Sequence, residues 1–173
     1  MGLNLKPEHK AIKTYYAELE NLTDFLNAKT EGAVSPLFAA VLRHCAGQMN
    51  RTLVEQYPLK RNGRNLRLDG AIVDIFNLAH GYWEAKDTAD DLNAEVKKKV
   101  EKGYPKDNTL FQAPRRAVLY QNGNLIVDAD ISHPENLIEI LKLFFEYEPP
   151  VIDQWQKAAE EFKLKVPELG EGL

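Results

Sequence analysis

Apolar residues recur at helical spacing in the first part of the chain and predict two amphipathic helices. One stripe predicts a helix over residues 7–27, with apolar positions Ile12, Tyr15, Leu19, Leu22 and Leu26. A second stripe predicts a helix over about 33–49, with apolar positions Phe38, Val41, Leu42, Cys45 and Met49. Ser35 and Pro36 resemble an N-cap and a first-turn proline, although Thr30 with Glu31 could also begin this helix.

The pattern then changes to segments that are typical of strands. The candidates are TLVEQYPLK (52–60), NLRLDGAIVDIF (65–76) and YWEAK (82–86), with a turn between the last two near 77–81. A more polar helix follows, in which Leu92, Val96 and Val100 form a narrow apolar stripe. Thr88 and Asp91 have capping-box spacing before it, and Gly103 ends it.

The last third of the chain predicts a hairpin followed by two helices. RRAVLYQNGNLIVDAD (115–130) contains the turn signal Asn122-Gly123 between two strand-like runs. Ser132 and Pro134 begin a helix with a well-defined apolar face that ends before Pro149, and a last helix covers about 151–163. The predicted order is two helices, three strands, a helix, two strands and two helices, which indicates an α/β fold with a central mixed sheet flanked by helices.

Length and composition fit one globular domain over residues 1–173. The chain is 44% hydrophobic and 28% charged, it has no apolar run long enough to span a membrane, and its N-terminus lacks a signal sequence. Cys45 is the single cysteine, which excludes an internal disulfide and a cysteine-rich metal site. We therefore expect a cytoplasmic protein. The net charge of −4 argues weakly against a surface covered with phosphate-binding groups, but KRNGRNLR (60–67) and KKKVEK (97–102) concentrate basic residues locally.

Three ionisable residues in the strand region suggest a site. Glu84 and Lys86 are two positions apart and therefore project from the same face of a strand. Asp69 lies 15 positions before Glu84 (84 − 69 = 15), so a hairpin would bring it opposite them. Two carboxylates are suited to Mg²⁺, and an ammonium group beside them can orient water or offset negative charge. Asp74, on the same strand as Asp69, falls on the opposite face by its odd offset.

The segment RLDGAIVDIFNLAHGYWEAKD resembles the core motif of the PD-(D/E)XK nucleases, in which an Asp on one strand precedes Glu-x-Lys on the next. The likeness is closest to the nuclease domains of restriction-modification enzymes, and it extends to Asp69-Gly70, GYWEAKD (81–87), KGYP (102–105) and VLYQNG (118–123). Leu68 stands where the motif has Pro. The resemblance implies a restriction-endonuclease-like core over about 30–147, with the helices 7–27 and 151–163 as additions.

The resemblance also implies residue roles and partners. Asp69 and Glu84 would bind Mg²⁺, for which Mn²⁺ can substitute, Glu31 would assist as a metal ligand, and Lys86 would activate or position water. Lys102, Tyr104 and Gln121 are weaker candidates for contact with double-stranded DNA. No recognition module is apparent, so we expect the chain to be the N-terminal part of a longer polypeptide with methyltransferase, helicase or target-recognition domains.

Other interpretations of these residues remain open at this point. Glu84 and Lys86 could form a surface ion pair worth less than about 1 kcal/mol. Glu31 could be an acid at a helix start, and Gln121 a solvated amide beside a turn. The alternative functions are a non-catalytic DNA-binding or assembly module on the same scaffold and a structure-specific DNA repair nuclease.

Overall fold

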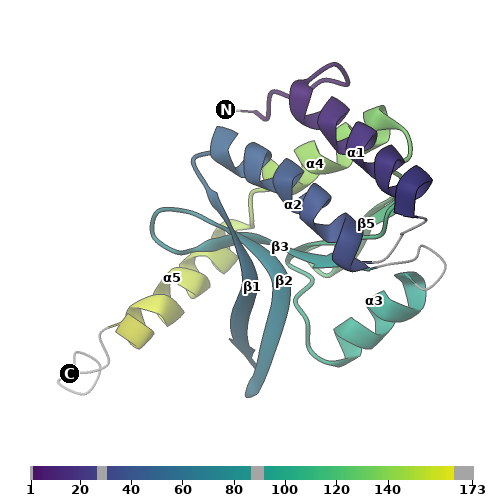
Figure 1. The fold of residues 1–173 in the computed structure, drawn as a ribbon. Helices are drawn as coiled ribbons and strands as arrows, with labels where there is room; N and C mark the ends of the chain where they lie inside the picture. Colours follow the sequence, from purple (N-terminus) through teal and green to yellow (C-terminus); the bar gives the residue numbers. More distant parts are fainter. Residues whose placement is uncertain (1, 27–30, 87–91, 166–173) are drawn as a thin grey trace, which may run out of the picture.

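A computed structural model describes residues 2–26, 31–86 and 92–165, and these form five helices and one six-stranded sheet. Figure 1 shows the arrangement. The helices are α1 (Lys10–Leu26), α2 (Glu31–Gln48), α3 (Leu92–Glu101), α4 (Pro134–Phe145) and α5 (Val151–Lys165). The strands are β1 (Thr52–Arg61), β2 (Arg64–Val73), β3 (Ala79–Ala85), β4 (Asn108–Gln112), β5 (Arg116–Gln121) and β6 (Asn124–Asp130).

The strands follow one another across the sheet in chain order. All neighbouring pairs are antiparallel except β3 and β4, which are parallel. The sheet is therefore mixed, as the sequence predicted. Because parallel strands need a crossover connection, the chain between β3 and β4 passes over one face of the sheet as α3. This crossover places a charged helix next to the end of β3.

The main core lies between the other face of the sheet and the helices α1, α2 and α4, which Figure 1 shows together above the strands. Trp83 of β3 is 1% exposed and stacks on Phe38 of α2, with ring centroids 5.9 Å apart. Leu92 and Val96 of α3 pack with Phe111 of β4 on the opposite face. Alternation along β3 therefore buries Trp83 in the main core and directs its neighbour Glu84 to the face covered by α3.

One strand was missing from the sequence prediction. The segment NTLFQ forms β4, and all five of its residues are buried although three are polar. Asn108 donates hydrogen bonds through Nδ2 to the carbonyls of His80 and Phe144, and the Thr109 hydroxyl donates to the Pro105 carbonyl. A short run with polar ends does not show the apolar alternation of a strand, so periodicity could not find it.

Several element boundaries also differ from the predictions. β3, for example, begins at Ala79, inside the turn predicted near 77–81, and ends at Ala85. The second helix begins at Glu31, as the Thr30-Glu31 alternative suggested, and Pro36 lies inside it near its first turns. β2 ends at Val73 and not at 76, because Asp74 forms a tight turn: its Oδ1 accepts the backbone N–H groups of Phe76 and Leu78. Thr88 and Asp91, the predicted cap of the next helix, lie outside the described residues.

Candidate active site

Asp69 and Glu84 meet where β2 and β3 separate. The pairing of these strands runs from Val73 opposite Ala79 to Gly70 opposite Trp83, so the next residues on each strand are Asp69 and Glu84. Their side chains bond to the opposing backbone in a reciprocal manner. The Asp69 N–H donates to Glu84 Oε1 at 3.2 Å, and the Ala85 N–H donates to Asp69 Oδ2 at 2.8 Å. The predicted convergence of the two carboxylates is present.

The Glu84 carboxyl lies in an unfavourable environment for a negative charge. It is 4% exposed, and burial, followed by the charge of Asp69, raises its pKa to about 8. Lys99 and the Asp69 N–H favour the charged form but offset these effects only in part. A carboxyl group in this state next to a second carboxylate is suited to a cation, because a positive charge would offset the repulsion from Asp69 and favour the ionised form of Glu84.

Lys99 of α3, which sequence reasoning missed, contacts Glu84 and links it to Glu95 of the same helix. Lys99 Nζ lies 3.4 Å from Glu84 Oε2, 3.9 Å from Glu95 Oε1 and 3.5 Å from the Tyr104 hydroxyl. Burial lowers the pKa of Lys99, but Glu84 and Tyr104 more than offset this, so that its pKa is raised and the ammonium group stays charged. Lys99 therefore holds Glu84 from the helix side.

Lys86 directly follows the same strand end and contacts Glu95 of α3. Its backbone N–H donates to the Gln112 carbonyl at 2.7 Å, and its Nζ lies 3.7 Å from Glu95 Oε2 on α3. The carboxylate of Glu95 thus lies between two lysines, Lys86 and Lys99, at 3.7 Å and 3.9 Å. The structure brings both ammonium groups to the site, and the one in contact with Glu84 belongs to Lys99.

The remaining predicted site residues have different surroundings. Tyr104 donates its hydroxyl hydrogen to the Arg67 carbonyl at 3.2 Å and lies under the Lys99 ammonium, whereas Lys102 is exposed at the end of α3. Gln121 is buried, and its Nε2 donates to Asn108 Oδ1 and to the Leu143 carbonyl. It is therefore neither a solvated amide nor accessible to DNA, because its amide group is used to join β5 to β4 and α4. The side chain of Glu31 lies outside the described part of the chain.

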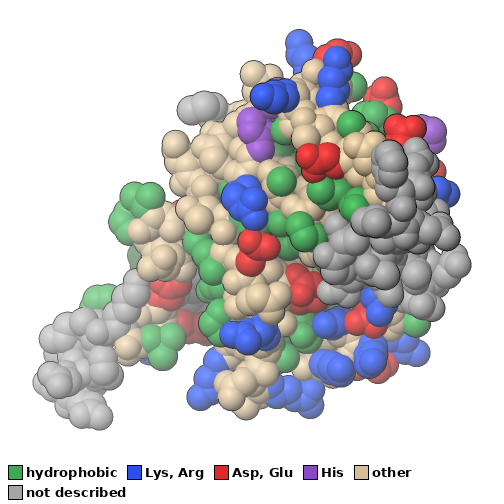
Figure 2. Space-filling model, in the orientation of Figure 1, with side chains coloured by type: hydrophobic (Ala, Val, Ile, Leu, Met, Phe, Trp, Pro, Cys, Tyr) green, Lys and Arg blue, Asp and Glu red, His purple; other side chains and the backbone are tan. Residues whose placement is uncertain are grey.

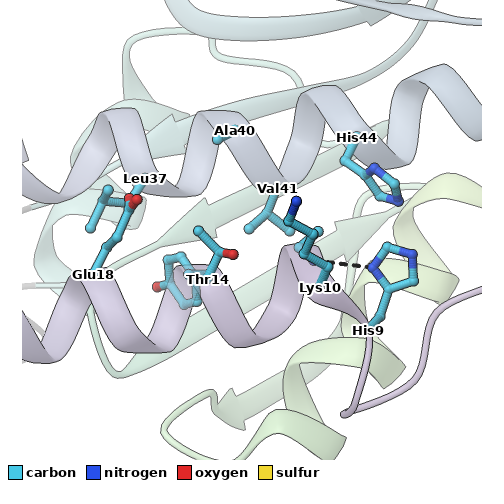
Figure 3. A pocket seen from close by; sticks show the side chains of 10 residues that line it. His9, Lys10, Thr14, Glu18, Leu37, Ala40, Val41 and His44 are labelled. Atoms are coloured by element: carbon cyan, nitrogen blue, oxygen red, sulfur yellow. Dashed lines mark hydrogen bonds between the residues drawn. The ribbon is translucent and has the colours of Figure 1, made fainter.

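Asp74, in the turn after β2, and the histidines His44 and His80 have structural contacts. The Asp74 carboxylate has other partners: its Oδ2 lies 2.8 Å from His80 Nε2, and its Oδ1 accepts two backbone N–H groups. Asp74 is therefore not part of the site. His44 lines a cavity of about 260 Å³ between α1 and α2, where it lies beside His9 with ring centroids 4.6 Å apart (Figure 3). None of the residues that line this cavity comes from the strand ends that carry Asp69 and Glu84.

The donor set fits a hard divalent cation. Carboxylate oxygens are the ligands that Mg²⁺ prefers, and it commonly uses one or two of them while keeping several waters. Within the described residues, no group of three or more His, Cys, Asp or Glu side chains is arranged to hold a metal ion. Among the described residues the candidate ligands are thus the pair Asp69 and Glu84, a number of carboxylates that Mg²⁺ commonly uses and that is too few for a structural zinc site.

The mixed six-stranded sheet and the helices around it form a restriction-endonuclease-like α/β fold. A solved structure similar to it is a cryo-EM structure of a DrdV–DNA complex, with 36% sequence identity and a TM-score of 0.78. The match covers 94% of this chain but 16% of the DrdV chain, so the chain spans about a sixth of that protein's length. No family profile and no curated protein matches the sequence. None of the described helices is long and apolar enough to cross a membrane.

Proposed function

We propose that this chain is a Mg²⁺-dependent DNA endonuclease domain of the PD-(D/E)XK type. The observation that carries the proposal is the buried Glu84 carboxyl, whose pKa is raised to about 8 beside Asp69 at the end of two separating strands. A restriction-endonuclease-like fold and the similarity to a structure that contains DNA support a role on DNA. The carboxylate pair indicates that this role includes chemistry, because a module that only binds DNA has no need of buried acids.

Each residue of the site has a distinct part in this proposal. Asp69 and Glu84 hold the cation, and their backbone hydrogen bonds fix the direction of both carboxylates. When bound, a divalent cation polarises a phosphodiester oxygen and makes water a better nucleophile at neutral pH. Lys86, at the open end of β3, orients the attacking water or offsets the negative charge that develops on the phosphate. Lys99 keeps Glu84 in place from the helix side.

The wider assignment concerns the polypeptide to which the chain belongs. We propose that it is part of a restriction-modification enzyme, with Mn²⁺ able to replace Mg²⁺ and double-stranded DNA as substrate. The methyltransferase, helicase or target-recognition functions would be carried by other domains. The match to a sixth of the DrdV chain fits a nuclease domain within a much longer protein.

The test is metal-dependent incision of duplex DNA by the polypeptide that carries this chain. With Mg²⁺ or Mn²⁺ we expect strand breaks that have 5′-phosphate and 3′-hydroxyl ends, which DNA ligase can reseal. EDTA should prevent the breaks. Binding of DNA without incision at any divalent metal concentration would favour the non-catalytic module, and a strong preference for branched or gapped substrates would favour a repair nuclease.

A further inference from the structure

The first two strands extend beyond the rest of the sheet. β1 and β2 pair along their whole length from Thr52–Val73 to Arg61–Arg64, whereas β3 pairs with β2 only over Gly70–Val73. We call residues 57–68 the β1–β2 arm. Its tip is the pair Asn62-Gly63, in which both residues have positive φ, 51° and 73°. This geometry is typical of a type I′ hairpin turn, so the arm is a regular two-stranded ribbon.

The two sides of the arm differ in character. Its inner side carries Tyr57, Leu59 and Leu68, which pack with Tyr82 of β3 and with Tyr104. Its outer side is formed by the residues between them, and there Lys60, Asn65 and Arg67 are exposed. Lys60 is the partner of Asn65 across the ribbon, and opposing residues project from the same side. The outer side is therefore polar and basic.

The basic residues of the inner side and of the outer side are used differently. Arg61 forms an ion pair with Asp107 at 3.1 Å, and Arg64 donates to the Glu101 carbonyl at 3.4 Å, so both hold the arm against the body. In the part of the chain that the structure describes, Lys60 and Arg67 have no carboxylate within 4.0 Å. Two exposed cations thus remain available to an external anion.

The base of the arm lies beside the carboxylate pair, because Leu68 directly precedes Asp69 on β2. Arg67 lies two residues before Asp69 on β2, at the base of the arm. At about 3.3 Å per residue, Arg67 is roughly 7 Å and the Lys60–Asn65 pair roughly 13 Å from Asp69 along the strand. Each DNA strand carries one phosphate per about 3.4 Å of helix axis, so this length matches about four base pairs.

A second group of cations lies on the other side of the site. Lys102 lies directly after the end of α3, three residues beyond Lys99. Residues three or four apart share a face of a helix, so Lys102 lies on the same face as Lys99, the face toward Glu84. Lys98 and Lys102 are exposed. Figure 2 shows Lys and Arg side chains gathered along the lower part of the molecule, over the arm and α3. The carboxylate pair therefore lies between two basic surfaces, although the whole chain has a net charge of −4.

We propose that the outer side of the β1–β2 arm binds the backbone of duplex DNA, with Lys60 and Arg67 contacting phosphates adjacent to the phosphodiester at Asp69 and Glu84. The inference rests on the proposed nuclease function and adds to it the surface that holds the substrate. Contacts to phosphates carry no sequence information, so the arm positions the duplex and does not select a sequence.

The test compares the double variant Lys60→Gln/Arg67→Gln with a matched control, Lys10→Gln/Lys13→Gln. The control removes two exposed charges from α1, which lies at the other end of the molecule from the arm tip (Figure 1). Binding to a labelled 30-base-pair duplex is measured in EDTA, to prevent cleavage, between 50 and 200 mM NaCl. The arm variant should bind about tenfold or more weakly at 50 mM, and its slope of log K against log [salt] should be smaller by about 2.

The outcomes separate this inference from the proposed function. The control should behave as the wild type, and the thermal midpoint of the arm variant should stay within a few degrees of the wild-type value, since both side chains are exposed. Equal affinity and equal salt slope for the arm variant and the wild type would overturn the inference, even if metal binding at Glu84 were demonstrated. Conversely, arm-dependent DNA binding by a protein that binds no divalent metal would support the arm and refute the nuclease.

Discussion

Glu84→Gln is expected to lower the rate of DNA cleavage by roughly 10³-fold or more, without loss of the fold. Glutamine has nearly the same shape as glutamate and can still accept the Asp69 N–H through its amide oxygen. It lacks the negative charge that a divalent cation needs, and loss of charge stabilisation of this kind corresponds to about 4 kcal/mol in the transition state. Asp69→Asn should have an effect of similar size, because the two carboxylates act together.

The control for this prediction is Glu139→Gln, which makes the same chemical change at an exposed position of α4. Its cleavage rate should be that of the wild type under the same Mg²⁺ concentration. DNA binding in EDTA at neutral pH should be preserved in Glu84→Gln, because the metal-free Glu84 carboxyl, with a pKa of about 8, is already largely uncharged. A cleavage rate of Glu84→Gln within tenfold of the wild-type rate would contradict the assignment of Glu84 as a metal ligand.

The metal-free protein is expected to lose stability as the pH rises from about 6 to 9, chiefly because of Glu84. The pKa of this carboxyl is about 8 in the folded protein and near its ordinary value of 4.5 in the unfolded chain. Between these values the folded state binds a proton that the unfolded state has released, so the free energy of unfolding falls with rising pH. At about 1.4 kcal/mol per pKa unit, the loss is on the order of a few kcal/mol by pH 9.

Thermal unfolding in EDTA at a series of pH values measures this effect. Glu84→Gln carries no titrating group at this position, so its midpoint should exceed the wild-type midpoint by several degrees at pH 9, with the difference shrinking toward pH 6. Groups that do not interact with Glu84 contribute equally to both proteins and cancel in the comparison. A difference between the two proteins that is constant with pH would show that the carboxyl titrates normally in the folded state.

Much of the fold could be predicted from the sequence, because several local signals agree with the tertiary structure. The apolar stripe of α1 is buried at Ile12 and Tyr15. Asn122 and Gly123 both have positive φ, as their predicted hairpin turn requires. The sequence contains a second signal of the same kind, Asn62-Gly63, which was not recognised as a turn and which forms the tip of the β1–β2 arm.

The candidate site was predicted in part for a physical reason that concerns β4. The Asp69–Glu84 pair depends on a hairpin, a local structure that spacing and alternation can reveal. The position of Lys99 depends on a helix that crosses between two parallel strands, and β4 was not recognised because Asn108, Thr109 and Gln112 are polar. Without β4 there was no reason to place α3 over Glu84. The same omission made Gln121 look solvated, although Asn108 of β4 is its buried partner.

The most direct test of the account is calorimetric titration of the protein with Mn²⁺ at pH 8. The central claim is that Asp69 and Glu84 form a binding site for a divalent cation. The wild type and Glu139→Gln should bind Mn²⁺ with the same affinity, with proton release because the Glu84 carboxyl must be ionised to bind the metal. Glu84→Gln and Asp69→Asn should show at least tenfold weaker binding. Absence of binding in the wild type, or equal affinity in all four proteins, would contradict the claim.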